Sequence, residues 1–340
     1  MGITIKDVAK EANVSIGTVS RVLSNKMHVT PATYARIMAA VEKLHYVPNT
    51  SAVRLVKKSS MTILCADSYY KNRAYDNPHM FDIISGITYE LKKKNYTLSL
   101  LDLGKKHEEA EKKILHAISS NASDGIVLNQ FFMTKKIEQA LLEHDFPHIC
   151  LGKPNFDSMI SWIDTNHALS SNLAVKHLLD VGCKRIAFIG GPAEDGIYKE
   201  RLRGYLRSLE HNNLEYRPEY VACASSNTQS IAEAAQKLLS LPEPPDSILC
   251  FNGLFAVIVM QVLDNIGLSI PRDIAVIAFD NYPYAPLVIP PLSVVDIDMF
   301  DLGQKAAQAL LKKLDNSELY IQTYTALPHL IIRESTARHT

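Results

Sequence analysis

The feature that most constrains the fold of this chain is an alternation, from residue 61 onward, of short apolar runs with helix-length segments. The runs are rich in β-branched or aromatic residues, as in MTILCA, DGIVLN and IAVIAFD, and they are separated by helical patterns at 80–94, 167–181, 198–212, 254–266 and 299–315. Repeated βα units of this kind predict an α/β fold with parallel sheets. One set of runs precedes about residue 164 and another follows it. We therefore expect two doubly wound lobes, with a cleft where their strand ends face each other.

Composition narrows the class of protein. With 340 residues, 47% of them apolar, the chain is long enough for two or three domains. The five cysteines lie far apart and form no CxxC pair, which indicates neither a disulfide framework nor a zinc site. The start of the chain lacks the apolar core of a secretory signal, and the uncharged stretch 247–263 is broken by Asn252-Gly253, which predicts a strand, a turn and a buried helix. We expect a cytoplasmic protein without metal or cofactor.

The net charge of zero hides an asymmetry along the chain. Residues 1–60 carry nine Lys or Arg against three acidic residues, a net charge of +6, and the remainder carries −6. A basic head on an acidic body is typical of a polyanion-binding module, because Lys and Arg that contact phosphates release condensed counterions. On charge alone, a merely solvated basic surface explains the head equally well.

Three capped helices are predicted within residues 1–47. Thr4, Ser15 and Thr30 stand at N-cap positions, and Pro31 suits the first turn of the third helix. The apolar residues at helical spacing are Ile5, Val8, Ala9 and Ala12, then Val19, Val22 and Leu23, and finally Ile37, Val41 and Leu44.

The second predicted helix leaves Ile16, Gly17, Ser20 and Arg21 facing outward. Two short helices joined by a tight turn form a helix-turn-helix, whose second helix enters the major groove. Small side chains there allow close approach, and Arg21 can reach guanine acceptors. The hydroxyl groups that can bond phosphates are those of Ser15, Thr18 and Ser20. Periodicity alone leaves open a small helical bundle with an ordinary polar face.

Residues 4–55 resemble the head of the lactose-repressor/galactose-repressor family of bacterial regulators. The DVA, VS..TVSRVL and Y.PN elements match with their spacing preserved. The resemblance implies base reading by Ile16, Gly17 and Arg21, and phosphate contacts from Ser15, Ser20 and Thr30. It implies packing support from Tyr46. The full set of DNA-binding candidates is Thr4, Ser15, Ile16, Gly17, Thr18, Ser20, Arg21, Thr30, Tyr46, Asn49, Ala52, Arg54 and Leu55.

Residues 48–60 correspond to the hinge helix of that family, which two subunits pair in the minor groove. Asn49 can cap a short new helix, because the proline before it ends the third one. Leu55 matches the leucine wedged between base pairs, and Ala52 the small residue that allows close approach. Arginine usually follows that alanine, whereas here it comes one place later, as Arg54. A linker that orders only on binding is the alternative.

The body resembles the same family through HLLDVGCKRIAFIGGP, ERLRGYLRSL, IPRDIAVIAFDN and LIIRES, which occur in family order. The resemblance implies the periplasmic sugar-binding-protein fold, with chain crossings between lobes near 162–165, 290–294 and 322–326. The expected domains are a helix-turn-helix head (1–47), a hinge (48–60) and an effector-binding and dimerisation domain (61–340). The first lobe would hold about 61–163 and 293–323, and the second about 164–292 and 324–340. Such a clamp can close by hinge motion on a ligand.

Arg201, Asn252 and Asp280 match pocket residues that in relatives hydrogen-bond a sugar or a base. Vicinal hydroxyls suit a carboxylate acceptor with guanidinium and amide donors. Relatives usually have Asp after the asparagine, and this chain has Gly253. NPHMF and LGKP look most like the oligosaccharide-responsive, maltose-type branch. The first-lobe candidates are Asn77, Phe81, Lys153, Trp162 and Asp164, of which Trp162 suits core packing better than a sugar platform.

We interpret the chain as a ligand-responsive DNA-binding regulator and predict that it is a repressor of sugar-utilisation genes. Twofold symmetry of a homodimer would demand a pseudo-palindromic operator. No leucine heptads follow IIRES, which favours a dimer over a tetramer. In relatives, sugars usually cause release from DNA, whereas purines promote DNA binding in some of them. Whether the ligand of this protein weakens or strengthens DNA binding stays open. The alternatives are a sugar-binding transport component, disfavoured by the basic head, and an α/β enzyme, disfavoured by the lack of a nucleophile elbow, metal cluster or phosphate loop.

Overall fold

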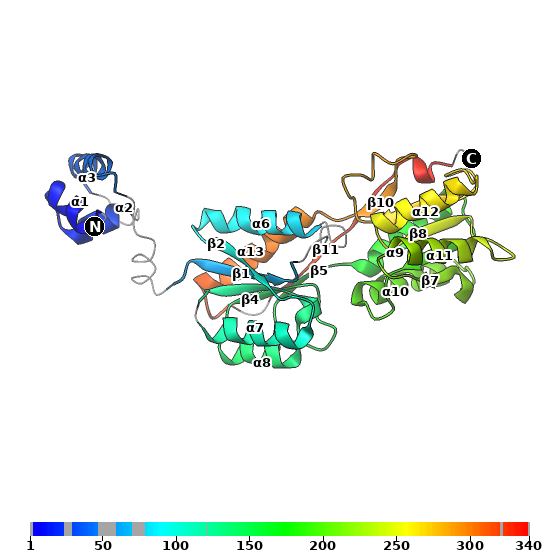
Figure 1. The fold of residues 1–340 in the computed structure, drawn as a ribbon, viewed down its shortest axis with the longest axis horizontal. Coiled ribbons are helices and arrows are strands. Elements are labelled where there is room, and N and C mark those ends of the chain that lie inside the picture. The colour runs from blue at the N-terminus through cyan, green and yellow to red at the C-terminus, as the bar shows by residue number, and fades with distance from the viewer. Residues whose placement is uncertain are drawn as a thin grey trace. The chain divides into compact units, whose positions relative to one another are not determined.

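The computed structural model describes residues 3–23, 29–46, 59–69, 79–120, 122–319 and 322–338. The chain divides into two compact units, Met1–Met61 and Thr62–Thr340, which we call the head and the body (Figure 1).

The described part of the head contains helices α1 (Ile5–Glu11), α2 (Ile16–Leu23) and α3 (Pro31–Lys43). They begin where the N-cap pattern predicted. Their shared core includes Val8, Val19 and Ile37, whose side chains are fully buried. The helical periodicity therefore identified the buried face of each helix correctly.

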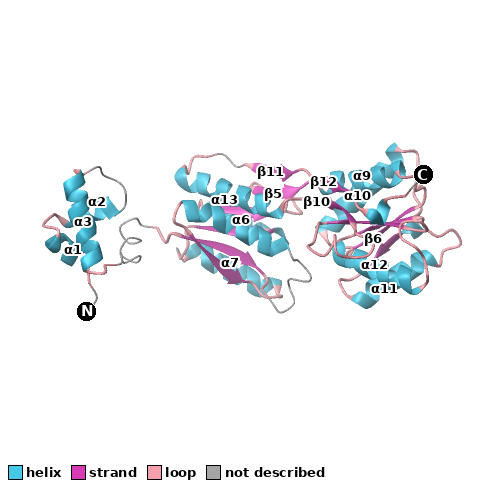
Figure 2. Ribbon diagram, turned by 90° about the horizontal axis from the view of Figure 1, so that it is seen from above, coloured by secondary structure: helices cyan, strands magenta, loops and turns pink. Residues whose placement is uncertain are grey.

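The first lobe of the body is built on a parallel six-stranded sheet in the order β11-β5-β4-β3-β1-β2. Helices cover both of its faces, α6 and α13 on one and α7 and α8 on the other (Figure 1), and Figure 2 views the lobe from the side of α6 and α13. Its elements are β1 (Thr62–Asp67), α6 (His79–Lys93), β2 (Thr97–Asp102), α7 (His107–Ser119), β3 (Gly125–Asn129), η1 (Gln130–Phe132), α8 (Lys135–Glu143), β4 (His148–Leu151), β5 (Trp162–Thr165), α13 (Met299–Asp315) and β11 (Thr323–Ala326).

The second lobe repeats this architecture with the strand order β12-β10-β9-β8-β6-β7, parallel except for β12. Helices α9 and α10 cover one face, and α11 and α12 the other. Its elements are α9 (His167–Asp180), β6 (Ile186–Gly190), α10 (Gly196–His211), η2 (Pro218–Tyr220), β7 (Val221–Cys223), α11 (Thr228–Leu239), β8 (Ser247–Cys250), α12 (Gly253–Asn265), β9 (Ala275–Phe279), β10 (Ser293–Asp296), β12 (His329–Ile331) and η3 (Glu334–Thr336). The stretch 247–263 is the strand, turn and buried helix that the sequence predicted.

The helices α6 and α13 come from distant parts of the sequence and cross in close contact. A Cβ atom on Gly86 would lie 2.1 Å from the carbonyl oxygen of Phe300, and one on Gly303 would lie 2.2 Å from that of Ile83. Only glycine permits this approach of the two backbones. The crossing attaches the late helix α13 to the first lobe.

The observed crossings fall within the predicted ranges 162–165 and 322–326, whereas the approximate lobe bounds differ from the structure by a few residues. Strand β10 pairs with β9 in the second lobe, so residues 293–296 do not belong to the first. Strand β11 pairs with β5 in the first lobe, so residues 324–326 do not belong to the second, and 164–165 complete β5. The chain therefore changes lobes after Thr165, Asp296 and Ala326. A short apolar strand next to a crossing can pair with either sheet, and its sequence does not say which.

Candidate functional site

Helix α2 begins after an N-cap residue, Ser15, which fixes where the helix starts and therefore which of its side chains face outward. Ser15 Oγ accepts a hydrogen bond from the backbone N–H of Thr18 at 3.1 Å and lies 2.8 Å from its Oγ1. Ile16 is 45% exposed although its side chain is apolar. Of the predicted base- and phosphate-contacting residues on this helix, Ile16, Gly17, Ser20 and Arg21 are exposed and Thr18 is half-buried.

Gly17 is not required by the fold of the head. A Cβ atom at this position would meet only Ser15 Oγ at 3.7 Å and Arg21 Nη2 at 3.8 Å, which are ordinary contacts. Glycine inside a helix is less favourable than alanine by about 0.5–1 kcal/mol. No close packing within the head requires glycine at this position. Gly17 is therefore consistent with a helix surface that another molecule approaches closely.

The other DNA-binding candidates that the structure describes in the head cap helices or pack in its core. Thr30 Oγ1 accepts from the backbone N–H of Thr33 at 3.3 Å. The backbone N–H and Oγ1 of Thr4 donate to the Asp7 carboxylate at 2.8 and 2.7 Å, and these bonds lower the pKa of Asp7. Tyr46 packs in the core of the head. The candidates Asn49, Ala52, Arg54, Leu55 and Asn77 lie outside the described residues.

Arg201 of α10 and Asp280, directly after β9, form a buried pair in the second lobe. Arg201 Nη2 lies 3.2 and 3.4 Å from the two carboxylate oxygens of Asp280, and Nη1 donates to the carbonyl oxygen of Phe251. The guanidinium carbon lies 4.2 Å from the centre of the Phe279 ring. The Nε of Arg201 is buried and has no hydrogen-bond acceptor within the described part of the chain. Two of the three second-lobe residues that the resemblance singled out therefore meet.

Asp280 is held in its ionised form despite its burial. Burial acts to raise its pKa, but the charge of Arg201 and the contact with His79 outweigh this effect and hold the pKa of Asp280 well below its usual range. Its backbone φ of 72° lies in the left-handed region, which is uncommon for a residue other than glycine. Conformations of this kind cluster at functional sites.

Asn252 follows β8 by two residues and has a structural role in the second lobe. Its Oδ1 accepts from the backbone N–H of Phe255 at 3.1 Å and caps α12. The side chain is 9% exposed, and its amide N–H groups are donors of the kind that a ligand hydroxyl accepts. The side-chain oxygen of Asn252 therefore stabilises the start of α12. Its side-chain nitrogen is chemically suited to donate hydrogen bonds to a ligand.

The structure gives a reason for Gly253. A Cβ atom on this residue would lie 2.7 Å from Cδ2 of Tyr282 and 3.2 Å from Oη of Tyr284. The Tyr282 side chain is 3% exposed, and its ring packs edge-on to that of Tyr284 at 5.3 Å. Two tyrosines thus occupy the space into which an aspartate at position 253 would project.

His79, the first residue of α6, connects the two lobes. Its Nε2 lies 3.8 Å from Oδ1 of Asp280, and its ring lies 4.6 Å from that of Tyr282. Sequence reasoning missed His79, Tyr282 and Tyr284. The motif NPHMF contains this histidine, but its role becomes visible only when the lobes are placed together.

Two of the first-lobe candidates lie at the carboxyl edge of its sheet, Lys153 after β4 and Asp164 near the end of β5, whereas Trp162 is the first residue of β5. Asp164 lies 3.2 Å from Nε2 of His167 and accepts from the backbone N–H of Lys153 at 2.8 Å. Burial acts to raise the pKa of Asp164, but its bond to His167 lowers it below the usual value. Trp162 packs against the apolar cluster of this lobe, in line with a core role. Phe81, in the first turn of α6, is 77% exposed.

A further polar pair at the same edge escaped the sequence analysis. Asn129, at the end of β3, donates through Nδ2 to Asp67 Oδ2 at 3.0 Å, and Asp67 ends the neighbouring strand β1. The carboxyl ends of parallel strands are where α/β sheets bind ligands. Polar residues at strand ends were a usable signal, but many such residues only close loops.

Comparison with known proteins identifies the family. Residues 4–49 match bacterial regulatory proteins of the lacI family, and residues 175–336 match a periplasmic binding protein-like domain. The chain is 30% identical over 338 residues to catabolite control protein A of Priestia megaterium, covering 99% of this chain and all of that protein. It belongs to the lacI family of bacterial regulators.

Other relatives agree with this assignment. The chain is 28% identical over 336 residues to the HTH-type transcriptional repressor PurR of Vibrio vulnificus, covering 98% of this chain and 99% of that protein. The transcriptional regulator CelR in complex with cellobiose has 26% identity and a TM-score of 0.74, covering 98% of this chain and 99% of that one. This lacI-family protein is a DNA-binding transcriptional repressor with a ligand-binding body, and it is not an enzyme.

Metal-binding clusters and membrane-spanning helices can be assessed only for the residues that the structure describes. The described residues contain no group of three or more His, Cys, Asp or Glu that could hold a metal ion. Within the same ranges, no helix has the length and apolar character needed to cross a membrane. All five cysteines are free thiols.

Proposed function

We propose that this lacI-family repressor is controlled by a neutral oligosaccharide that binds between the lobes, at the Arg201–Asp280 pair. A ligand here would meet a buried carboxylate, a guanidinium with one unused N–H, and the amide of Asn252. A sugar with vicinal hydroxyls can both accept from and donate to such a group. The proposal rests on the buried ion pair of Arg201 and Asp280. Because the two charges balance each other, the site selects its ligand by hydrogen bonding rather than by net charge.

The aromatic groups around the pair support the same ligand class. Tyr282, Tyr284 and His79 form an aromatic cluster beside Asp280, and the two tyrosines occupy the space where an aspartate at position 253 would project. Apolar faces of pyranose rings pack on aromatic side chains. CelR, a relative over nearly the whole chain, is seen with the disaccharide cellobiose, which supports an oligosaccharide of the maltose or related type.

Regulation requires that the ligand favour one arrangement of the lobes over the other. His79 brings a first-lobe group to Asp280, so a ligand that replaces this contact bonds both lobes at once. Its differential affinity for the open and closed forms would shift the DNA-competent population. Operator contacts would come from Ile16, Gly17 and Arg21 on α2, with phosphate contacts from Ser15, Ser20 and Thr30.

The repressor would act in the cytoplasm as a homodimer on a pseudo-palindromic operator. The loop between β9 and β10 carries Leu287 and Ile289, which are 77% and 92% exposed. Two large apolar side chains so close together and so exposed are typical of an interaction surface.

The test is fluorescence anisotropy of the full-length protein on a library of palindromic operators at two salt concentrations, followed by a panel of sugars. We expect selective binding that weakens with salt and changes with one oligosaccharide. Arg201→Ala should abolish the sugar response while the protein, although less stable because Asp280 loses its buried counterion, still binds the operator. The control is Arg203→Ala on the same helix, whose side chain is 51% exposed and pairs with Glu200. A normal response in Arg201→Ala, or a response only to a purine base, would refute the proposed ligand.

A further inference from the structure

An exposed aromatic ring stands at the carboxyl edge of the first-lobe sheet. Phe131 lies in η1, directly after β3, and is 65% exposed, whereas its neighbour Phe132 is 3% exposed and packs in the core of the lobe. The core is therefore filled by Phe132 and does not need Phe131. A single exposed apolar side chain is common in proteins, so the surroundings of Phe131 decide whether it is suited to binding.

These surroundings hold Phe131 in a defined position. Its backbone N–H donates to Oδ1 of Asn129 at 3.0 Å, and Asn129 Nδ2 donates to the buried carboxylate of Asp67 at 3.0 Å. The Phe131 ring packs edge-on to that of Phe132 at 5.2 Å and lies 4.6 Å from the ring of His107, the first residue of α7. We call these three rings the aromatic platform. Its neighbours fix Phe131 while most of the residue stays open to solvent.

Phe131 lies along the same edge of the sheet as the candidate ligand-binding residues of this lobe. Strands β5, β4, β3 and β1 are neighbours in the sheet, and Asp164, Lys153, Asn129 and Asp67 lie at or just after their carboxyl ends. The carboxyl ends of parallel strands are where α/β sheets bind ligands. A ligand between the lobes that is long enough would extend along this edge toward Phe131.

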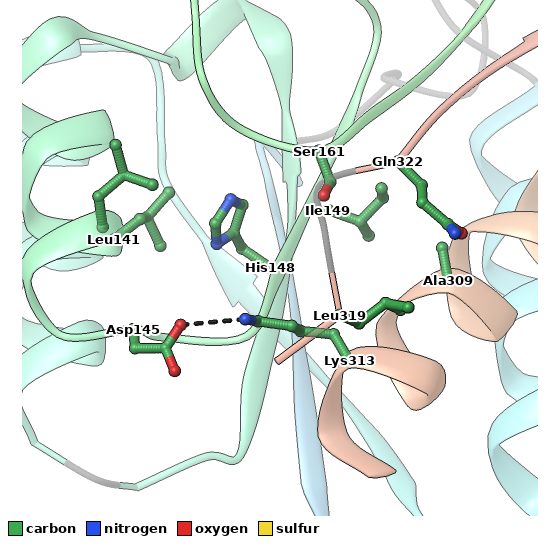
Figure 3. Close-up of a pocket in the computed structure, with 10 residues that line it drawn as sticks. Leu141, Asp145, His148, Ile149, Ser161, Ala309, Lys313, Leu319 and Gln322 are labelled. Atoms are coloured by element: carbon green, nitrogen blue, oxygen red, sulfur yellow. Dashed lines mark ion pairs between the residues drawn. The ribbon is translucent and has the colours of Figure 1, made fainter. Parts of the chain in front are cut away.

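The opposite edge of the same sheet has a pocket of different character. It has a volume of about 140 Å³ and is formed where α8 ends, β4 begins and α13 ends (Figure 3). Among the described residues that line it there is no Phe, Tyr or Trp, and its Lys313 is paired with Asp145 at 3.1 Å. The aromatic platform therefore distinguishes the carboxyl edge of the sheet from this pocket.

We propose that Phe131 stacks against an outer sugar ring of the oligosaccharide ligand, and that this contact selects ligands by their chain length. This role rests on the proposed function, in which the Arg201–Asp280 pair holds another ring of the same molecule. The C–H groups on the face of a pyranose ring can pack on the open surface of Phe131. His107 stands beside that surface and can bond a sugar hydroxyl, because an imidazole both donates and accepts. A platform that is already held in place loses little conformational entropy on binding.

The experiment is calorimetric titration of the full-length protein with glucose, maltose, maltotriose and maltotetraose, and with the matching cello-oligosaccharides. In the wild type, affinity should rise at the chain length at which an outer ring reaches Phe131. Phe131→Ala should weaken binding of that sugar and of longer ones by about three- to tenfold and leave shorter sugars unchanged. Phe131→Trp keeps a flat ring and should retain the preference for longer chains. The control Leu142→Ala removes a 44% exposed apolar side chain at the pocket on the opposite edge and should change nothing.

Two results would overturn the role of Phe131 alone. In the first, the wild type binds oligosaccharides, Arg201→Ala abolishes this binding, and Phe131→Ala binds sugars of every length as the wild type does. In the second, Phe131→Ala sediments as a monomer where the wild type is a dimer, which would place the ring in an interface between subunits. If no sugar of either series binds to the wild type, both this role and the proposed function are wrong.

Discussion

His79 Nε2, at the start of α6 in the first lobe, lies 3.8 Å from Oδ1 of Asp280, which follows β9 in the second lobe. The same carboxylate pairs with Arg201 at 3.2 Å within its own lobe. Asp280 is therefore shared between a fixed partner and one contributed from the opposite lobe. A ligand that competed for this carboxylate would alter the contact between the lobes and would thereby link its binding to the arrangement of the body.

Asp280→Asn is expected to lower the free energy of unfolding of the body by about 3–5 kcal/mol at neutral pH, because it leaves the Arg201 charge buried without a counterion. The pKa of Asp280 in the folded protein lies below its ordinary value of 3.8. The stabilisation by its carboxylate is therefore complete above that ordinary value and is lost as the pH falls below it. Urea unfolding of both proteins between about pH 7 and pH 3 should show their difference shrinking in acid.

A suitable control for this measurement is Asp264→Asn, because Asp264 is an exposed aspartate near the end of α12. It should leave the unfolding free energy nearly unchanged at every pH. If the wild type and Asp280→Asn differ by a constant amount across the range, the buried pair does not act as the structure indicates.

Gly253→Asp, which restores the residue usual in the family, is expected to destabilise this protein by about 1–3 kcal/mol. The new side chain would collide with the Tyr282 ring, because even a Cβ atom would lie 2.7 Å from it. Combining Gly253→Asp with Tyr282→Ala should recover part of the loss, so that the two changes are not additive. Thermal unfolding of the two single variants and the double variant measures this coupling. Strict additivity would show that the tyrosine does not fill the aspartate position.

Gly17→Ala should separate operator binding from folding of the head. The added methyl group meets only ordinary contacts, so the unfolding temperature should stay the same or rise slightly. Operator affinity should fall, because the helix can no longer approach the duplex as closely. Arg21→Ala should weaken binding by about 1–3 kcal/mol and relax preference at one base pair, which competition with single-base operator variants would reveal. Unchanged operator affinity in both variants would remove α2 as the reading helix.

Much of the fold could be predicted from the sequence because it depends on local patterns. The caps Ser15 and Thr30, and the strand and helix within 247–263, follow from hydrogen-bonding chemistry and apolar periodicity. The lobe to which β10 belongs could not be predicted, because pairing with β9 is a long-range choice that leaves no local mark.

The site shows the same division. Arg201 and Asp280 were found through a resemblance, and the structure shows them in contact. His79 and Tyr282 were missed because their importance arises only from proximity across the lobes and to a neighbouring loop. From the sequence, Gly253 appears only as the loss of the family's aspartate. The structure shows that the Tyr282 ring occupies the space in which that aspartate side chain would lie.

Ile289→Glu together with Leu287→Glu should shift the protein from dimer to monomer. Both side chains are largely exposed, and burying a carboxylate in a self-complementary interface is strongly unfavourable. Sedimentation velocity of the full-length variant should show the smaller species at concentrations where the wild type is dimeric. Operator affinity should fall with it, because each head then holds only one half-site. Met159→Glu, on a loop of the first lobe where the side chain is 68% exposed, is the matched control and should stay dimeric. If the double variant sediments as the wild type does, these residues lie outside the interface between subunits.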